Sequence, residues 1–185
     1  MSLREFFLRY LMPRLDWKRV LKTLLFIFLS LLVQTMLLSR TRILGICPYA
    51  LPAAAVALGM FEGPVAGVLY SLLLGYFADM AFVENTVLFT VLFPALAFAT
   101  GFIAQFFLNR RFFAYMGAAL LGLLITALGQ LLHTSAMDGF SAAMIPTAVL
   151  QTLWSLPLAA LAYVFPARWS QFAPASKGEK PLIRE

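Results

Sequence analysis

The residues best suited to chemistry in this chain are a few polar and ionisable side chains inside long apolar stretches. Asp79 is the clearest, because a carboxylate within an apolar segment is costly and often marks a functional site. It stands near the end of its segment, and there we expect it to act as a helix cap or to bind a backbone amide. Gln130 and His133 lie three residues apart near the end of a later segment, and a pocket lined by all three would bind a polar ligand.

The other residue types offer little for catalysis or metal binding. The chain has one cysteine (Cys47) and one histidine (His133), which excludes a disulfide framework and a metal site of Cys/His type. It contains no paired-carboxylate motif, no G-x-S-x-G nucleophile motif and no P-loop. We therefore expect no enzymatic activity, no cofactor and no bound metal.

The segments that carry these side chains are predicted to be transmembrane helices. Of the 185 residues, 62% are hydrophobic and 12% are charged, and the mean hydropathy is +0.89. Soluble domains are about half apolar and about a quarter charged, so the composition excludes an ordinary soluble protein. The predicted fold class is all-α, a polytopic membrane protein that forms a compact bundle of six transmembrane helices. The six predicted spans are 20–38, 46–61, 65–82, 86–108, 114–134 and 142–165.

The charges that flank these spans predict the domains and the orientation. Residues 1–19 form an aromatic and basic head, 20–168 the transmembrane domain and 169–185 a flexible tail. With both termini in the cytoplasm, all of the 14 Lys and Arg residues except Arg40 and Arg42 lie inside, as the positive-inside rule requires. The head is either a short helix at the membrane interface or a leader that only assists insertion.

The net charge of +6 suggests an anionic partner. Because the basic residues flank apolar helices, we expect that partner to be anionic lipid rather than nucleic acid. Arg110 and Arg111, in the loop between the fourth and fifth spans, are the predicted cytoplasmic contact.

Small residues recur every four positions on several spans, and this spacing marks the faces on which membrane helices pack. The third span gives the clearest stripe. Its members are Gly63, Gly67, Ser71, Gly75 and Asp79. We expect such stripes to serve packing, and Gln34, Gln105, Gln130 and Gln151 to form hydrogen bonds between helices. Glu62, in the predicted turn before Gly63 and Pro64, is expected to be a solvated loop charge.

The chain resembles the MreD family of rod shape-determining membrane proteins. The resemblance rests on six short spans and on the stretch Gly67-Val-Leu-Tyr-Ser-Leu-Leu-Leu-Gly75-Tyr-Phe-Ala-Asp79, because the family carries a similar Gly-rich helix ending in Gly, three residues and Asp. The family's last helix also has a polar residue followed by Pro, as Gln151 and Pro157 stand here, although Asn is commoner at the first place.

This resemblance implies a non-enzymatic scaffold in the bacterial inner membrane that maintains rod shape and controls where peptidoglycan is made. It implies association with a bitopic MreC-like protein, with a RodA-type glycosyltransferase and a penicillin-binding transpeptidase in the same complex, and indirectly with MreB. The stripe on the third span, together with Gln151 and Pro157, would then supply helix-packing or partner contacts.

A vitamin carrier is the alternative. The predicted bundle is similar to the six-helix substrate-binding components of energy-coupling-factor transporters. Those components typically present an Ala-x-x-x-Ala face on their first helix, whereas residues 23–38 contain no alanine and the loop 39–45 is short for a substrate lid. A pocket lined by Asp79, Gln130 and His133 would favour the carrier, and a tightly filled interior would favour the scaffold.

Overall fold

A computed structural model describes residues 17–38, 40, 46–81, 87–106 and 111–169. Every regular element in these ranges is a helix. In chain order the helices are α2 (Trp17–Leu32), the π-helical η1 (Val33–Leu38), α3 (Leu51–Glu62), α4 (Pro64–Ala81), α5 (Leu88–Phe106), α6 (Phe112–Asp138) and α7 (Met144–Trp169). Five of them, with α2 and η1 taken together, are long and apolar enough to cross a membrane. The chain is thus a helical, multi-pass membrane protein, as its composition predicts.

The second predicted span is the one that differs from expectation. It was predicted to be helical over 46–61, but residues 46–50 are not helical and α3 begins at Leu51. Two prolines explain this start, because Pro48 has no backbone N–H and Pro52 stands in the first turn of α3, where a missing N–H costs nothing. With 12 residues, α3 is about 18 Å long, which is short of the roughly 30 Å hydrocarbon core.

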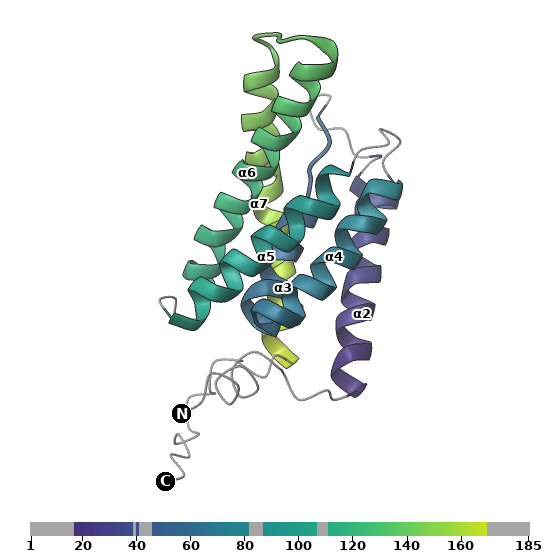
Figure 1. Ribbon diagram of the computed structural model, residues 1–185, viewed down its shortest axis with the longest axis vertical. Helices are drawn as coiled ribbons and strands as arrows, with labels where there is room; N and C mark the ends of the chain where they lie inside the picture. Colours follow the sequence, from purple (N-terminus) through teal and green to yellow (C-terminus); the bar gives the residue numbers. More distant parts are fainter. Residues whose placement is uncertain (1–16, 39, 41–45, 82–86, 107–110, 170–185) are drawn as a thin grey trace.

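The short helix α3 is the centre of the bundle. All of its residues are buried, and it contacts α2, α4, α5, α6 and α7 (Figure 1). A helix that is apolar on every side must be enclosed by protein or lipid. Here the other helices enclose it, and the two clusters of buried apolar residues both include parts of α3.

The helix ends fall into two groups at opposite ends of the bundle. The start of α2 and the end of α7 lie at the same end, which is the lower end in Figure 1. We call it the basic end, because Lys18, Lys22, Arg111 and Arg168 belong to the helix ends gathered there. The first and last described helices therefore begin and end at the same end of the bundle.

At the opposite end, the α6–α7 hairpin projects beyond the other helices (Figure 1). Its helices have 27 and 26 residues, hence about 40 Å of length each, against about 27 Å for the 18-residue α4. Gly139 has a φ of 85°, a value that glycine adopts without strain, where the chain leaves α6.

The helix α2 begins inside the predicted head. Residues 17–19 form its first turn, because Trp17 and the charges after it continue the helix outward from the apolar span. Most of the predicted head and tail, 1–16 and 170–185, lies outside the described residues.

Candidate functional site

The glycine stripe of α4 faces the inside of the chain. A Cβ on Gly67 would lie 2.7 Å from the Cα of Gly59 on α3, and a Cβ on Gly75 would overlap the backbone of Phe89 on α5. Ser71, between them, is fully buried. The packing role predicted for the stripe is confirmed, but these residues contact α3 and α5 of the same chain, so they are not exposed to a partner.

Gly59 lies at a three-helix contact that the stripe alone did not reveal. Its Cβ would overlap the carbonyl oxygen of Ala97 on α5, and a Cβ on Gly101 would lie 2.8 Å from the carbonyl oxygen of Gly59 and 2.9 Å from the Cα of Pro64. The backbones of α3, α4 and α5 therefore touch at this point. A signal was present in the sequence, because Gly59 continues the four-residue spacing of Gly63 and Gly67 backward along the chain.

The turn between α3 and α4 also depends on glycine. Gly63 has a φ of 90° and a ψ of 171°, a backbone conformation that L side chains rarely adopt, and its N–H donates to the carbonyl oxygen of Gly59 at 3.1 Å. The tight connection predicted at Glu62-Gly63-Pro64 is confirmed.

Asp79 caps the next helix. Its carboxylate accepts hydrogen bonds from the backbone amides of Phe89 at 3.1 Å and Thr90 at 2.7 Å, and from the hydroxyl of Thr90 at 2.6 Å. These amides belong to the first turn of α5, where N–H groups have no partner within the helix. The capping role expected for Asp79 is confirmed, and it fixes the end of α4 to the start of α5.

Gln34 binds the non-helical segment 46–50. Its side-chain amide donates to the carbonyl oxygen of Pro48 at 3.1 Å, and its side-chain oxygen accepts from the amide of Ala50 at 2.9 Å. Ser155 on α7 accepts from the amide of Tyr49 at 2.8 Å. Inside a membrane, non-helical backbone must find such partners within the protein. The hydrogen-bonding role predicted for Gln34 is confirmed, although its partner is this segment rather than a helix.

A small cavity lies between this segment, α6 and α7. It has a volume of about 10 Å³, and its polar lining comes from Tyr49, Thr126, Gln130, Gln151, Thr152 and Ser155. The volume suffices for about one water molecule. Of the three residues predicted to line a polar pocket, Gln130 lines this cavity, whereas Asp79 and His133 do not. Asp79 instead lies against the start of α5, and His133 is half-buried farther along α6.

Glu62 is not the solvated loop charge that its place in a turn predicted. It is 3% exposed, and one carboxylate oxygen lies 2.7 Å from the guanidinium of Arg19, which is 13% exposed. The other oxygen lies 3.4 Å from the hydroxyl of Thr23. The end of α3 meets the first turn of α2 here, so water is excluded and the two charges neutralise each other. Neither residue could be paired from sequence, because 42 positions separate them.

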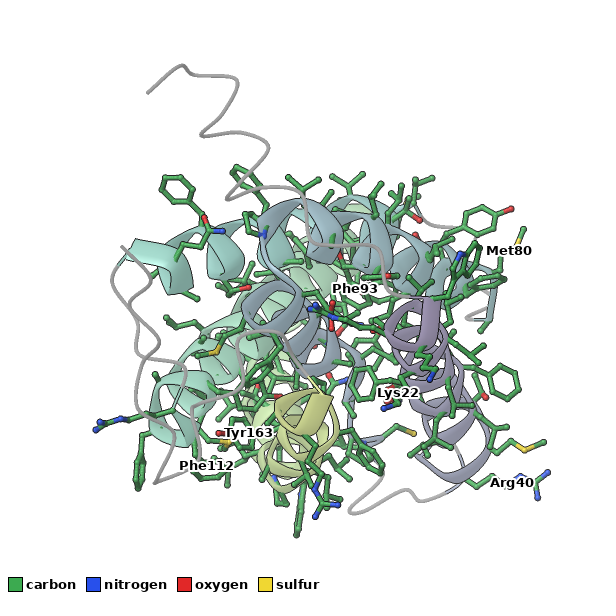
Figure 2. The ribbon with its side chains drawn as sticks, turned by 90° about the horizontal axis from the view of Figure 1, so that it is seen from below. Lys22, Arg40, Met80, Phe93, Phe112 and Tyr163 are labelled. Carbon is green, nitrogen blue, oxygen red and sulfur yellow. The ribbon has the colours of Figure 1, made fainter. Side chains whose placement is uncertain are left out.

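Aromatic residues join α3, α6 and α7 near the basic end. The hydroxyl of the fully buried Tyr115 lies 3.1 Å from the carbonyl oxygen of Ala53 and 3.0 Å from that of Ala159. The ring of Tyr163 packs edge-on against Phe112 at a centroid distance of 5.2 Å, and Figure 2 shows these two side chains next to each other. The sequence did not single out Tyr115.

The other predicted site residues lie apart from these contacts. Gln151 lines the small cavity, whereas Pro157 is exposed on α7. Arg111 is exposed at the start of α6, and Arg110 lies outside the described residues.

A large apolar groove separates α2 and η1 from α4. It has a volume of about 490 Å³, with one wall from Leu24 to Met36 and the other from Leu73 to Ala81. Thr35 is the one polar lining residue, and its hydroxyl donates to the carbonyl oxygen of Leu31 at 2.8 Å. The sequence did not predict this groove.

The described residues contain no cluster of three or more His, Cys, Asp or Glu side chains that would hold a metal ion. Several of their polar contacts join one segment to another. Comparisons with models of protein families, with curated proteins and with solved structures find no match to this chain.

Proposed function

We propose that this chain is a non-enzymatic membrane scaffold of the bacterial cell-elongation machinery. It lies in the cell membrane with both termini in the cytoplasm and associates with an MreC-like bitopic protein. A RodA-type glycosyltransferase and a penicillin-binding transpeptidase belong to the same complex, which connects indirectly to MreB. The proposal starts from the resemblance of the third span and from the basic residues that flank the helices.

The observation that carries this proposal is the backbone contact among α3, α4 and α5. At Gly59, Gly67 and Gly101 the helices approach so closely that a single Cβ would collide with a neighbouring backbone. The cavity beside the start of α3 holds about 10 Å³, whereas small-molecule sites occupy about 300–1,000 Å³. The close backbone crossing of these three helices supports a protein that acts through its outer surface. The small volume of the cavity beside α6 and α7 weighs against a vitamin site at that place, and so against the alternative, a vitamin-binding component of an energy-coupling-factor transporter.

The first test is to tag the protein in its native membrane, purify it in mild detergent and identify its companions by mass spectrometry. Recovery of an MreC-like protein or of the wall-synthesis enzymes is expected. A tagged, unrelated multi-pass protein at equal abundance serves as the control. Recovery of an ATPase pair with a coupling membrane subunit would instead establish the transporter.

The partner surface requires a second test, because the glycine stripe of α4 is buried. One exposed apolar residue on each of four outer helices is replaced by Trp. The four substitutions are Leu69→Trp on α4, Val91→Trp on α5, Leu121→Trp on α6 and Leu153→Trp on α7, at side chains that are 60%, 68%, 61% and 63% exposed. If the chain is a scaffold, one substitution lowers partner recovery while the protein level stays constant. Equal recovery with all four variants would contradict a lateral partner contact on these faces.

A further inference from the structure

We infer that the groove between α2 and α4 binds one acyl chain of a membrane phospholipid from the leaflet opposite the basic end. This site goes beyond the proposed scaffold and does not depend on it.

The groove exists because α2 is held by polar contacts at its two ends. At the basic end, Arg19 and Thr23 contact Glu62 at the end of α3. Past the other end of α2, Gln34 of η1 binds Pro48 and Ala50. Between these contacts, Phe28 and Leu24 are 63% and 40% exposed. The polar contacts thus fix both ends of this segment to the core. Between them, Phe26 and Ile27 are buried in one cluster with Leu74 and Ala78 of α4, whereas Leu24 and Phe28 line the groove.

The length and position of the groove match one lipid leaflet. The wall from Leu24 to Met36 is about 18 Å long at the helical rise, and one leaflet of hydrocarbon is about 15 Å deep, half of the bilayer core. One wall of the groove runs from the middle of α2 into η1, and the other wall runs along the second half of α4 to its end. Arg40 lies just past η1 and is exposed, and its side chain points away from the bundle in Figure 2. In the inferred site this cation pairs with the lipid phosphate at that end.

The residues that line the groove suit an acyl chain better than a transmembrane helix of a partner protein. Helices associate in membranes through small residues that allow close backbone approach and through polar side chains that bond across the interface. The groove presents Phe28, Leu32, Met36, Leu73 and Phe77, whereas the glycines of α4 face α3 and α5. Met36 is flexible and fills irregular apolar gaps, and the Leu and Phe side chains add apolar surface for a hydrocarbon chain. The chemistry of these walls therefore favours lipid.

Native mass spectrometry tests retention of the lipid. The full chain is extracted from its native membrane, exchanged into lipid-free detergent and weighed. We expect a single retained phospholipid. Leu73→Trp fills the groove and should reduce the retained fraction severalfold, whereas Leu153→Trp, on the exposed face of α7, should leave it unchanged. Loss of lipid from the unmodified chain, or equal retention by both variants, would overturn the inference.

Photo-crosslinking identifies the occupant directly. Phe28 in the groove, or Phe98 on the exposed face of α5, is replaced by p-benzoyl-phenylalanine, and the purified protein is irradiated after the same detergent exchange. A phospholipid adduct at position 28 and its absence at position 98 is the expected result. An adduct to another protein, or to residues of the same chain, would show that a polypeptide fills the groove and would overturn the inference. The crosslinking result is independent of the scaffold test, because it does not change which proteins are recovered with the tagged chain.

Discussion

At the scale of single residues, three polar contacts in the described residues join segments that are far apart or differently folded. Asp79 binds the first turn of α5, Gln34 binds residues 46–50, and Glu62 neutralises Arg19. Each contact satisfies a group whose exposure to hydrocarbon would be costly. Removing one partner should therefore lower the free energy of unfolding by more than the contact itself contributes, because the other partner stays buried without a bond.

The ion pair gives the sharpest test at this scale. Glu62→Gln leaves the guanidinium of Arg19 buried without its counter-charge, and the free energy of unfolding should fall by about 3–5 kcal/mol. The double variant Arg19→Met with Glu62→Met removes both charges and should recover much of that loss. Denaturant titration in mixed micelles measures the difference. Lys18→Gln, at an exposed position, is the control, and a loss for Glu62→Gln no larger than the control's would contradict a buried pair.

Gln34 makes a second residue-scale prediction. Gln34→Leu removes the partners of the Pro48 carbonyl and the Ala50 amide. The free energy of unfolding should fall by about 1–3 kcal/mol for each group that is left without a bond. Hydrogen exchange at Ala50 should accelerate. Thr147→Val is the control, because Thr147 is exposed and its hydroxyl donates locally to the carbonyl oxygen of Ala143, just before α7. Unchanged exchange at Ala50 would show that Gln34 does not hold this segment.

At the scale of elements, the bundle depends on how closely α3, α4 and α5 approach. Glycines at the crossing points bring the backbones into contact, and the resulting van der Waals contacts replace the hydrophobic driving force that lipid does not supply. The short α3 is buried on all sides, so the other helices pack on it rather than on one another alone. By contrast, α2 meets the core through its two polar contacts and a narrow apolar face.

Substitution of the glycines tests this account. Gly59→Ala places a Cβ against the carbonyl of Ala97, so the backbones of α3 and α5 must separate, and overpacking of this kind costs about 1–3 kcal/mol or more. Gly117→Ala is the matched control, because no neighbouring atom lies within 4 Å of a Cβ there and alanine favours the helix. Thermal unfolding in detergent should separate the two variants, and equal midpoints would contradict the close crossing.

At the scale of the whole molecule, the arrangement of charges predicts one orientation. The basic end carries Lys18, Lys22, Arg111 and Arg168, while Arg40 lies at the opposite end. Loops rich in Lys and Arg remain on the cytoplasmic side during insertion. The α6–α7 hairpin, which projects beyond the other helices, would then extend toward the outside of the cell.

Cysteine labelling checks this orientation. In a Cys47→Ala background, which removes the only native thiol, Arg111→Cys should react with a membrane-impermeant maleimide only after the cells are opened. Ser141→Cys, between α6 and α7, should react in intact cells. The reverse pattern would place the basic end outside and would also exclude the proposed cytoplasmic contacts of Arg111.

The sequence by itself determined the helical membrane class, because long uncharged runs in a chain with so few charges can satisfy their backbone groups only as membrane helices. It also indicated the packing face of α4, since small residues at four-residue spacing lie on one side of a helix. The capping role of Asp79 was predictable from its place near the end of an apolar segment, where the next helix begins nearby.

Only the tertiary structure decided what these features contact. Gly59 and Tyr115 acquire their importance from backbone atoms of other helices, and Arg19 meets Glu62 across a gap in sequence that no local pattern connects. Segment 46–50 leaves the helical pattern at its proline, and Gln34 and Ser155 supply hydrogen bonds that a helix would otherwise provide. The groove along α2 is likewise invisible in the sequence, because a space between two apolar helices depends on how far apart the contacts at their ends hold them.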